Sequence, residues 1–209
     1  DLPAPQGSAE PMGKPWGGDE PKDSAAAQFI IEQTRALPDG ESMHVVCLGA
    51  STNLASAIKI APEIVPRIKA YILGFQYDAE DGIWNKSEFN VRRDLNAADF
   101  LLNCTELELH VMPTSVSGRL KFDRDETFAK LAQRGEWGGF LTEKWKQKFG
   151  ESERWTMWDV ALVEAMVRPD LAQQSKVTTP PENVQRHVWM YDSIDVEAMK
   201  RDYWKTLSM

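Results

Sequence analysis

The sequence predicts an open, Rossmann-like α/β fold with a mostly parallel central sheet flanked by helices. Residues 43–48 and 68–73 are continuous apolar runs with β-branched residues, which indicate interior strands covered on both faces. Helical patterns alternate with these runs, as in parallel sheets. Residues 24–209 contain no linker-like stretch and are expected to form one domain. Residues 1–23, rich in proline and glycine, are expected to form a loop segment.

In the first half, Ser24 is expected to cap a helix over residues 25–37, which Pro38-Asp39-Gly40 ends. A small-residue turn follows the first predicted strand, and a polar, aromatic loop is expected over residues 75–90. The remaining elements expected here are helices over 54–60 and 96–102 and a strand over 107–112.

The second half is predicted to be more helical and carries most of the eight tryptophans. The chain has three histidines, each in an apolar, strand-like run. Their spacing does not match that of metal ligands, so we interpret His44, His110 and His187 as core or edge residues. The elements expected after residue 120 are helices over 123–134, 136–149, 158–167 and 195–207, with strands over 175–179 and 187–191.

Composition limits the classes of function. The 209 residues include 24 Lys and Arg against 32 Asp and Glu, a formal net charge of −8. No basic stripe favours nucleic-acid binding, and no apolar run approaches the roughly 20 residues of a membrane span. Cys47 and Cys104 are expected to be buried thiols. We expect a cytoplasmic protein, with a periplasmic or secreted protein after signal removal as the alternative.

Small and polar residues follow the two predicted interior strands, where open parallel sheets bind ligands. Gly49 to Asn53 forms a turn that lets backbone groups approach a ligand, although a plain strand-to-helix turn explains it as well. Glu88 and Asn90 alternate around Phe89, so an extended segment would point both toward one ligand. A carboxylate and an amide suit sugar hydroxyls. The alternative is a solvated loop with Phe89 in the core.

Asp159 opens the predicted helix over 158–167 and stands beside Trp158. Its carboxylate suits a hard cation, and the indole offers a stacking face. The competing interpretation is that Asp159 complements the helix dipole and Trp158 packs in the core.

These segments, in this order, resemble the inosine-uridine-preferring nucleoside hydrolases, a family of calcium-dependent N-ribosyl hydrolases. The resemblance includes G-x-x-T-N at Gly49 to Asn53, E-F-N-x-x-x-D at Glu88 to Asp94, and the helix that begins at Trp158. It covers most of the chain from Ser24 to Pro169. The pair of motifs at this distance is fairly specific.

The resemblance implies roles for individual residues. The backbone carbonyl of Leu48 resembles a calcium ligand, and Asp159 resembles the aspartate that binds calcium and ribose hydroxyls. Glu88 and Asn90 resemble the ribose-binding pair. Trp158 stands where purine-preferring members carry a base-stacking tryptophan. Two residues match less closely: Asn85, for a further substrate-binding asparagine, and Trp16, for a second aromatic wall.

One family motif has no counterpart here. Members begin with a strand carrying D-x-D-x-x-x-D-D, which supplies calcium ligands and the general base. The resemblance therefore implies hydrolysis of purine ribonucleosides to base and ribose, with an N-terminal portion needed beyond these 209 residues. We expect the 209-residue chain alone to be inactive or nearly so. The alternatives are a catalytically silent nucleoside- or ribose-binding protein and an α/β interaction module.

The expected cofactor is Ca²⁺, absent if the N-terminal aspartates are missing. The expected partner is a small nucleoside. We expect the chain to form a homo-oligomer, either a dimer or a tetramer, or to associate with a separate N-terminal fragment.

Overall fold

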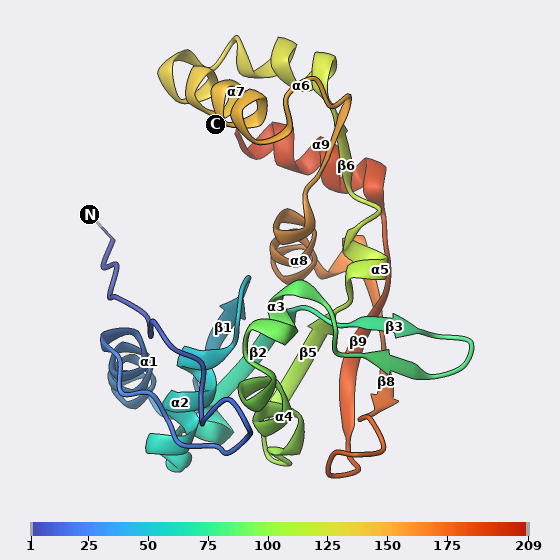
Figure 1. Ribbon diagram of the computed structural model, residues 1–209. Helices are drawn as coiled ribbons and strands as arrows, with labels where there is room; N and C mark the ends of the chain where they lie inside the picture. Colours follow the sequence, from blue (N-terminus) through green and yellow to red (C-terminus); the bar gives the residue numbers. More distant parts are fainter. Residues whose placement is uncertain (1, 208–209) are drawn as a thin grey trace.

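The computed structural model describes residues 2–207 and confirms an α/β fold around a mostly parallel sheet (Figure 1). The strand order is β1-β2-β5-β9-β8. The first four strands of this order are parallel, and β8 pairs antiparallel with β9 at one edge. Sheet strands span β1 Met43–Cys47, β2 Ile68–Leu73, β5 Glu108–Met112, β8 Ala172–Thr178 and β9 His187–Ile194.

Helices cover both faces of this sheet. Ser24 caps α1 through its side chain, which accepts from the Ala27 amide, as the sequence predicted. Asp195 caps α9 in the same way. The α-helices span α1 Ala25–Ala36, α2 Thr52–Ile60, α3 Phe89–Arg93, α4 Leu95–Asn103, α5 Thr114–Ser117, α6 Arg124–Leu131, α7 Gly135–Phe149, α8 Trp158–Val167 and α9 Val196–Thr206. The 3-10 helices span η1 Pro62–Arg67 and η2 Pro169–Leu171.

Alternate residues of the central strands enter two separate cores. In β2, Ala70 and Ile72 belong to the core that α1, α2 and α4 cover. Tyr71 and Leu73 belong to the core that α5, α8 and α9 cover. This alternation explains the unbroken apolar run of β2, since both faces of the strand are buried. The prediction of an interior strand at 68–73 is confirmed.

The corresponding prediction for residues 43–48 is wrong. Within residues 2–207, β1 is an edge strand that pairs only with β2. Val45, Val46 and Cys47 are half-buried, and an apolar groove of about 260 Å³ runs between this edge and α1. An apolar run indicates that both faces of a strand are covered. It does not indicate whether the strand pairs with a neighbour on each side.

The predicted loop over 75–90 contains regular structure that the sequence prediction missed. Strands β3 (Gln76–Asp78) and β4 (Ile83–Asn85) form an antiparallel hairpin. Its turn contains Asp81 and Gly82, and Gly82 has a φ of 68°. A Gly in a left-handed conformation after Asp is typical of hairpin turns, so this signal was present in the sequence.

A second small unit joins β5 to the last strands. β6 (Lys121–Asp123) pairs with β7 (Arg154–Thr156), and α6 and α7 lie between them in sequence. In Figure 1, α6, α7 and α9 lie together beyond the carboxyl end of the sheet, above α8. Aromatic side chains hold this unit together; Trp145 is fully buried and contacts Phe128 and Trp155 edge-on.

Residues 2–23 form a strap with no helix and only an isolated bridge between Lys14 and Gly17. Met12 is fully buried, and its amide donates to Asp94 Oδ2 over 2.7 Å. The same carboxylate oxygen accepts from Thr52 Oγ1, and Oδ1 caps α4 at the Ala97 amide. Residues 2–23 thus form no helix or named strand, yet the strap is tied to the rest of the chain. Besides Asp94, the side chains of Asn53, Ser56 and Asn96 bond to its backbone.

Four stacked rings cross the parallel strands. Neighbouring centroids of His44, Tyr71, His110 and Trp189 lie 5.5, 4.6 and 6.1 Å apart in that order. His110 also contacts Gln174 and Glu108. The interpretation of His44 and His110 as core or edge residues agrees with these contacts. No helix within residues 2–207 is long and apolar enough to cross a bilayer.

Candidate functional site

Asn90 links the carboxyl ends of two neighbouring strands. Its Nδ2 donates to the carbonyl of Leu73, at the end of β2, over 3.0 Å and to the carbonyl of Leu48, just past β1, over 3.3 Å. The parallel register brings these two carbonyls to one rim of the sheet. Because the amide nitrogen is fixed by both carbonyls, the Asn90 side-chain oxygen is the group left to accept a hydrogen bond from a ligand.

Glu88 is the N-cap of α3 and lies next to Asn90. Its Oε2 accepts from the amides of Asn90, over 2.9 Å, and Val91, over 3.1 Å, and its side chain is buried. The condition of an extended segment is not met, because the helix begins at Phe89. Phe89 is exposed and does not enter the core. Oε2 of Glu88 thus caps the helix, and Oε1 is left to accept a hydrogen bond from a ligand.

Gly74 lets the end of β2 approach this carboxylate. A Cβ placed on Gly74 would lie 2.9 Å from Val91 Cγ2 and 3.3 Å from Glu88 Oε2. The next residue, Phe75, is buried with a φ of 63°, which is strained for an aromatic residue. Thr114 fixes it, since both its backbone amide and its hydroxyl donate to the Phe75 carbonyl. Strained backbone at this rim is consistent with a functional role.

We therefore expect Gly74→Ala to displace Glu88 and loosen the start of α3. The added methyl group would overlap Val91 and should lower the free energy of unfolding by about 1–3 kcal/mol. Urea unfolding followed by tryptophan fluorescence measures this loss. Gly139→Ala is the matched control, because a Cβ there meets nothing within 4 Å and the helix gains propensity. Equal stability of the two variants would show that Gly74 is not required at this position.

Asp159 and Trp158 open α8 at the same end of the sheet. The Met157 amide donates to the Leu120 carbonyl over 2.8 Å, which anchors the helix start to the segment after β5. A Cβ on Gly118 would lie 3.6 Å from the Trp158 indole nitrogen, so the indole packs over that glycine. Trp158 is nevertheless 41% exposed, which does not fit the competing interpretation as a core residue.

The Asp159 carboxylate has no hydrogen-bond or ion-pair partner within the described part of the chain. Asp159 is exposed, but partial desolvation of its carboxyl still raises its pKa from the ordinary aspartate value, because desolvation disfavours the charged form. Its place in the first turn of α8 opposes this effect in part, since helix N-termini attract negative charge. A carboxylate that is open on one side and has no described partner is suited to a cation or to developing positive charge.

The residues described here do not form a calcium site on their own. Across residues 2–207, no three His, Cys, Asp or Glu side chains cluster in a way that could hold a metal ion. Asp159 and the Leu48 carbonyl provide two oxygens, and the carbonyl already accepts from Asn90. Calcium requires six to eight oxygen ligands. Two oxygens do not suffice, so no catalytic step is assigned to a metal.

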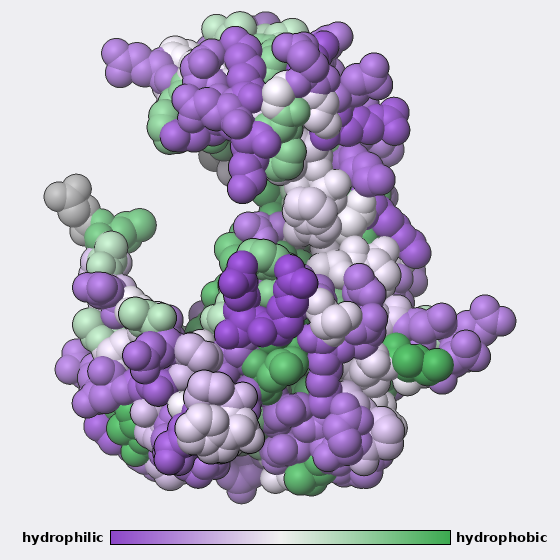
Figure 2. Space-filling view, in the orientation of Figure 1, coloured by the Kyte–Doolittle hydropathy of each residue, from purple (hydrophilic) through white to green (hydrophobic). Residues whose placement is uncertain are grey.

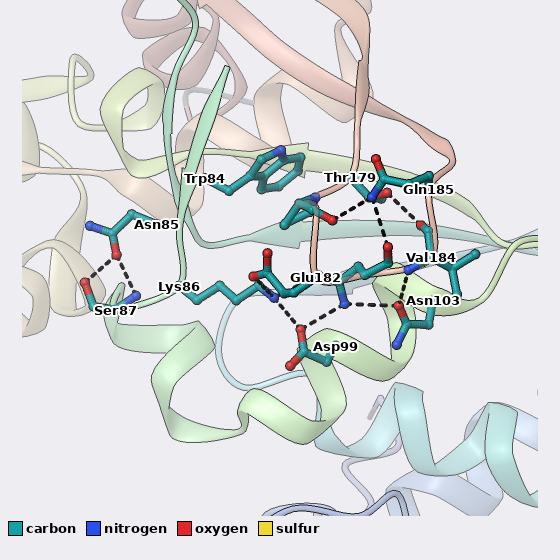
Figure 3. Close-up of polar contacts among 12 residues, drawn as sticks. Trp84, Asn85, Lys86, Ser87, Asp99, Asn103, Thr179, Glu182, Val184 and Gln185 are labelled. Carbon is teal, nitrogen blue, oxygen red and sulfur yellow. Dashed lines mark hydrogen bonds and ion pairs between the residues drawn. The ribbon is translucent and has the colours of Figure 1, made fainter. Parts of the chain in front are cut away.

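Asn85 and Trp16 make their described contacts with other parts of the chain. Figure 3 shows Asn85 in its own turn, where Oδ1 accepts from the Ser87 amide and hydroxyl. Its Nδ2 donates to Gln76, and it lines a different cavity, of about 600 Å³, beside the β3–β4 hairpin. Trp16 is 83% exposed on the N-terminal strap and makes no ring contact with a described residue. Within residues 2–207, no hydrogen bond or ring contact joins either residue to Asn90 or Trp158.

Lys86 and Asp94 support the site, and the sequence prediction assigned neither of them a role. Lys86 donates to Asp99, Glu182 and Asn183, so it joins the loop before α3 to α4 and the β8–β9 turn (Figure 3). Asp94 anchors the strap described above. Their polar character, within or beside the interpreted motif, was the available signal. The partners of Lys86, however, lie 13 to 97 positions away in sequence, and Met12, a partner of Asp94, lies 82 positions away.

Comparison with known proteins gives one family. A sequence model described as "Inosine-uridine preferring nucleoside hydrolase" matches residues 1–200. "Probable uridine nucleosidase 2" of Arabidopsis thaliana is 33% identical over 86 residues, which are 41% of this chain and 26% of that protein. "Probable uridine nucleosidase 1" of Oryza sativa subsp. japonica is 24% identical over 164 residues, 68% of this chain and 50% of that protein. The chain thus spans between a quarter and a half of these curated relatives.

Two solved structures share the fold. A plant nucleoside hydrolase superposes with a TM-score of 0.70 at 16% identity, covering 91% of this chain and 69% of that one. A purine-preferring ribonucleoside hydrolase from Gardnerella vaginalis gives a TM-score of 0.68 at 20% identity, with 91% and 68% covered. At these identities the likeness concerns the fold alone.

Proposed function

Because the chain belongs to the inosine-uridine preferring nucleoside hydrolase family, we propose that it carries the ribose- and base-binding part of an enzyme that hydrolyses the N-glycosidic bond of purine ribonucleosides. The main support is the junction at Asn90. Its amide holds the ends of β1 and β2 together, with Glu88 beside it, on the rim where α8 begins.

In this proposal, ribose hydroxyls donate to Asn90 Oδ1 and Glu88 Oε1, the two oxygens that their local hydrogen bonds leave available. Cleavage of a ribosyl–base bond passes through an oxocarbenium-like sugar. The Asp159 carboxylate, which has no partner among the described residues, would stabilise that positive charge. The base leaves against the exposed face of Trp158. Water adds its hydroxyl to C1′ and its proton to the base nitrogen.

Calcium is proposed only for a protein that supplies further ligands beyond Asp159 and the Leu48 carbonyl. We propose that the free edge of β1 accepts the portion of the family domain that this chain does not match. The apolar groove beside that edge supports this placement. Association as a dimer or tetramer is the alternative, and light scattering separates the two arrangements. The free thiols of Cys47 and Cys104 support a cytoplasmic location.

The test compares two proteins, the 209-residue chain and the product of the complete reading frame that encodes it. Each is incubated with inosine, with and without a calcium chelator, and released hypoxanthine is measured. We expect calcium-dependent release by the complete product and little or none by the 209-residue chain. Robust release by the short chain would contradict the need for further residues.

A catalytically silent nucleoside- or ribose-binding protein is the second candidate, and the incomplete metal site favours it. It predicts binding of inosine or ribose without turnover by either protein. Isothermal titration calorimetry on the same samples distinguishes this outcome from hydrolysis.

We expect Trp158 to set the preference for purine. Base–aromatic stacking contributes about 1–3 kcal/mol per base, and the larger purine face gains more of it. In the complete protein, Trp158→Ala should therefore lower kcat/KM on inosine by roughly 5- to 150-fold and lower it less on uridine. Trp158→Phe should recover part of the loss. The named relatives include uridine as well as purine enzymes, so this assay also decides between the two classes.

The control is Trp137→Phe, an exposed tryptophan on α7 that is not part of the proposed site. It should leave both activities unchanged. Equal losses on inosine and uridine in Trp158→Ala, together with a lower Tm, would instead identify Trp158 as a packing residue.

A further inference from the structure

The turn between β8 and β9 (residues 179–186) contacts the segment that leads into the proposed ribose-binding pair. Asn183 of this turn lies 97 positions after Lys86 and accepts a hydrogen bond from it. We propose that Lys86 is a positioning residue, which ties Glu88 and Asn90 to the turn and so fixes where the ribose is held. This inference rests on the proposed function, because it takes the role of Glu88 and Asn90 from it.

The start of α3 needs support from outside the helix. α3 has five residues, of which only Val91 is buried. Figure 2 shows hydrophilic side chains gathered over α3 on the face turned to the viewer. Helices this short are not stable by themselves. Packing of one side chain fixes α3 only in part, so the position of Asn90 depends on how the ends of the helix are held.

The Lys86 ammonium group uses its three donors within the chain. Its Nζ lies 2.6 Å from Asp99 Oδ1, 2.6 Å from Glu182 Oε1 and 2.8 Å from Asn183 Oδ1, so the side chain points into this cluster (Figure 3). The Lys86 side chain is 17% exposed. An ammonium group has three protons to donate, and with all three bound it has none left for a substrate. Lys86 is therefore suited to hold the loop and not to bind the ligand itself.

The turn that receives Lys86 is fixed on the end of α4. The Asn183 side chain is buried, and its Nδ2 donates to Asn103 Oδ1 over 3.0 Å and to Asp99 Oδ1 over 3.1 Å. The Arg186 guanidinium group donates to three main-chain carbonyls over 2.7–3.0 Å, those of Leu101, Leu102 and Leu107. A satisfied polar network rigidifies the structure around it. The turn can thus fix a neighbouring segment instead of following its movements.

Trp84 forms a second contact with the same part of the chain. Its indole nitrogen donates to the carbonyl of Thr178, at the end of β8, over 3.0 Å. The Trp84 ring also packs edge-on against Phe75, the residue with the strained backbone at the rim. Contacts at Trp84 and Lys86 together fix both the place and the direction of the chain where it leaves β4.

The chain between Lys86 and Glu88 is too short and too restrained to absorb a movement. Ser87 is the one residue between them, and its amide and hydroxyl both donate to Asn85 Oδ1. Neighbouring Cα atoms are about 3.8 Å apart across a trans peptide, whatever the backbone conformation. A shift of Lys86 therefore reaches Glu88, whose carboxylate caps α3, and changes the place of Asn90.

Stabilisation of the fold alone explains less of this arrangement. Glu182 is largely exposed, and ion pairs that are open to solvent contribute little to stability. A merely stabilising contact has no need to stand two residues before the proposed ribose-binding pair. The two explanations differ in what they predict. Stabilisation affects the Tm of the whole protein, whereas positioning affects the cap of α3 and the affinity for the ribose.

The test is Lys86→Met in the complete protein, which keeps an apolar stem and removes the ammonium group. The first measurement is hydrogen–deuterium exchange of the Asn90 and Val91 amides, which donate to Glu88 Oε2. This measurement needs no substrate. We expect exchange to be roughly tenfold faster in the variant, because the cap opens more often.

The second measurement is steady-state kinetics on inosine. We expect kcat/KM of Lys86→Met to fall roughly 10- to 100-fold, mainly through a higher KM, because the ribose-binding groups are displaced. Lys86→Arg keeps the positive charge and should recover part of both losses. Glu182→Ala removes one acceptor on the exposed turn and should give a smaller change in the same direction. Combined with Lys86→Met it should add little, since both act through one contact.

The matched control is Lys69→Met, which removes a partly exposed ion pair with Glu108, 3.2 Å long, at the opposite end of β2. It should change neither the amide exchange nor KM. Unchanged exchange of the Asn90 and Val91 amides in Lys86→Met would overturn the inference, as would faster exchange with an unchanged KM in an active enzyme. If Lys86→Met does not fold, the same outcomes are read from Glu182→Ala.

One outcome separates the inference from the proposed function. Faster exchange in Lys86→Met, in a protein whose wild type neither binds nor cleaves inosine, would support the positioning of Glu88 by Lys86 and contradict the proposed hydrolysis.

Discussion

Asp159→Asn in the complete protein should lower kcat on inosine by about 100- to 1,000-fold, the range for loss of one preorganised electrostatic group. The amide keeps the shape of the carboxylate but loses its negative charge. KM should change less, because Asn90 and Glu88 still hold the ribose. Steady-state release of hypoxanthine gives both constants.

Two measurements separate this effect from damage to the fold. The Asp159 carboxylate has no described partner, so Asp159→Asn should not lower the Tm. Glu164→Gln is the matched control: Glu164 lies on the same helix, and burial also raises its pKa. It should retain most of the activity. Comparable losses in the two variants would mean that α8, and not Asp159 itself, supports catalysis.

The largest effect on stability is expected from Asp94→Ala. Asp94 is 3% exposed and accepts from the Met12 amide, the Thr52 hydroxyl and the Ala97 amide. Alanine removes the cap of α4, which costs about 1 kcal/mol, and leaves buried donors unsatisfied at about 1–3 kcal/mol each. We expect a total loss of about 3–5 kcal/mol in the free energy of unfolding, measured by urea denaturation.

Limited proteolysis should also show earlier cleavage within residues 2–23, because the Met12 amide loses its acceptor and the strap retains only its other side-chain bonds, such as Asn96 to the Met12 carbonyl. Asp19→Ala serves as the control on the same strap. Asp19 forms only an exposed ion pair with Lys59, and such pairs contribute about 0–1 kcal/mol. A loss below about 1 kcal/mol in Asp94→Ala would contradict the assignment of Asp94 as the anchor of the strap.

Local chemistry predicted much of the fold. The cap at Ser24, the interior strand β2 and the start of α8 at Trp158 follow from nearest-neighbour rules of capping and periodicity. The errors concern features that depend on distant partners. The position of β1 at the sheet edge depends on which strands lie beside it, and the apolar run of residues 43–48 carries no information about that choice.

The candidate site shows the same division. The sequence motif identified Glu88 and Asn90 as candidates, but the argument that both point the same way depended on an extended segment, whereas Glu88 caps a helix. The signal for this cap was a carboxylate before a helix. The helix has only five residues and follows a polar loop, so the sequence pattern did not indicate it. The bond from Asn90 to Leu48 spans 42 positions and depends on the parallel pairing of β1 with β2. No pattern along the chain predicts such a contact without the sheet.

The strand order also determines when the sheet can be completed during folding. The connection from β1 to β2 is a short helical crossover, and that from β2 to β5 adds the β3–β4 hairpin to two helices. The pairing of β5 with β9 joins His110 and Trp189, which are 79 positions apart. Closing a longer loop costs more chain entropy, so this pairing should form after the three earlier strands. Trp189 stacks on His110 only when β9 has docked. Its fluorescence should therefore report the last step of refolding.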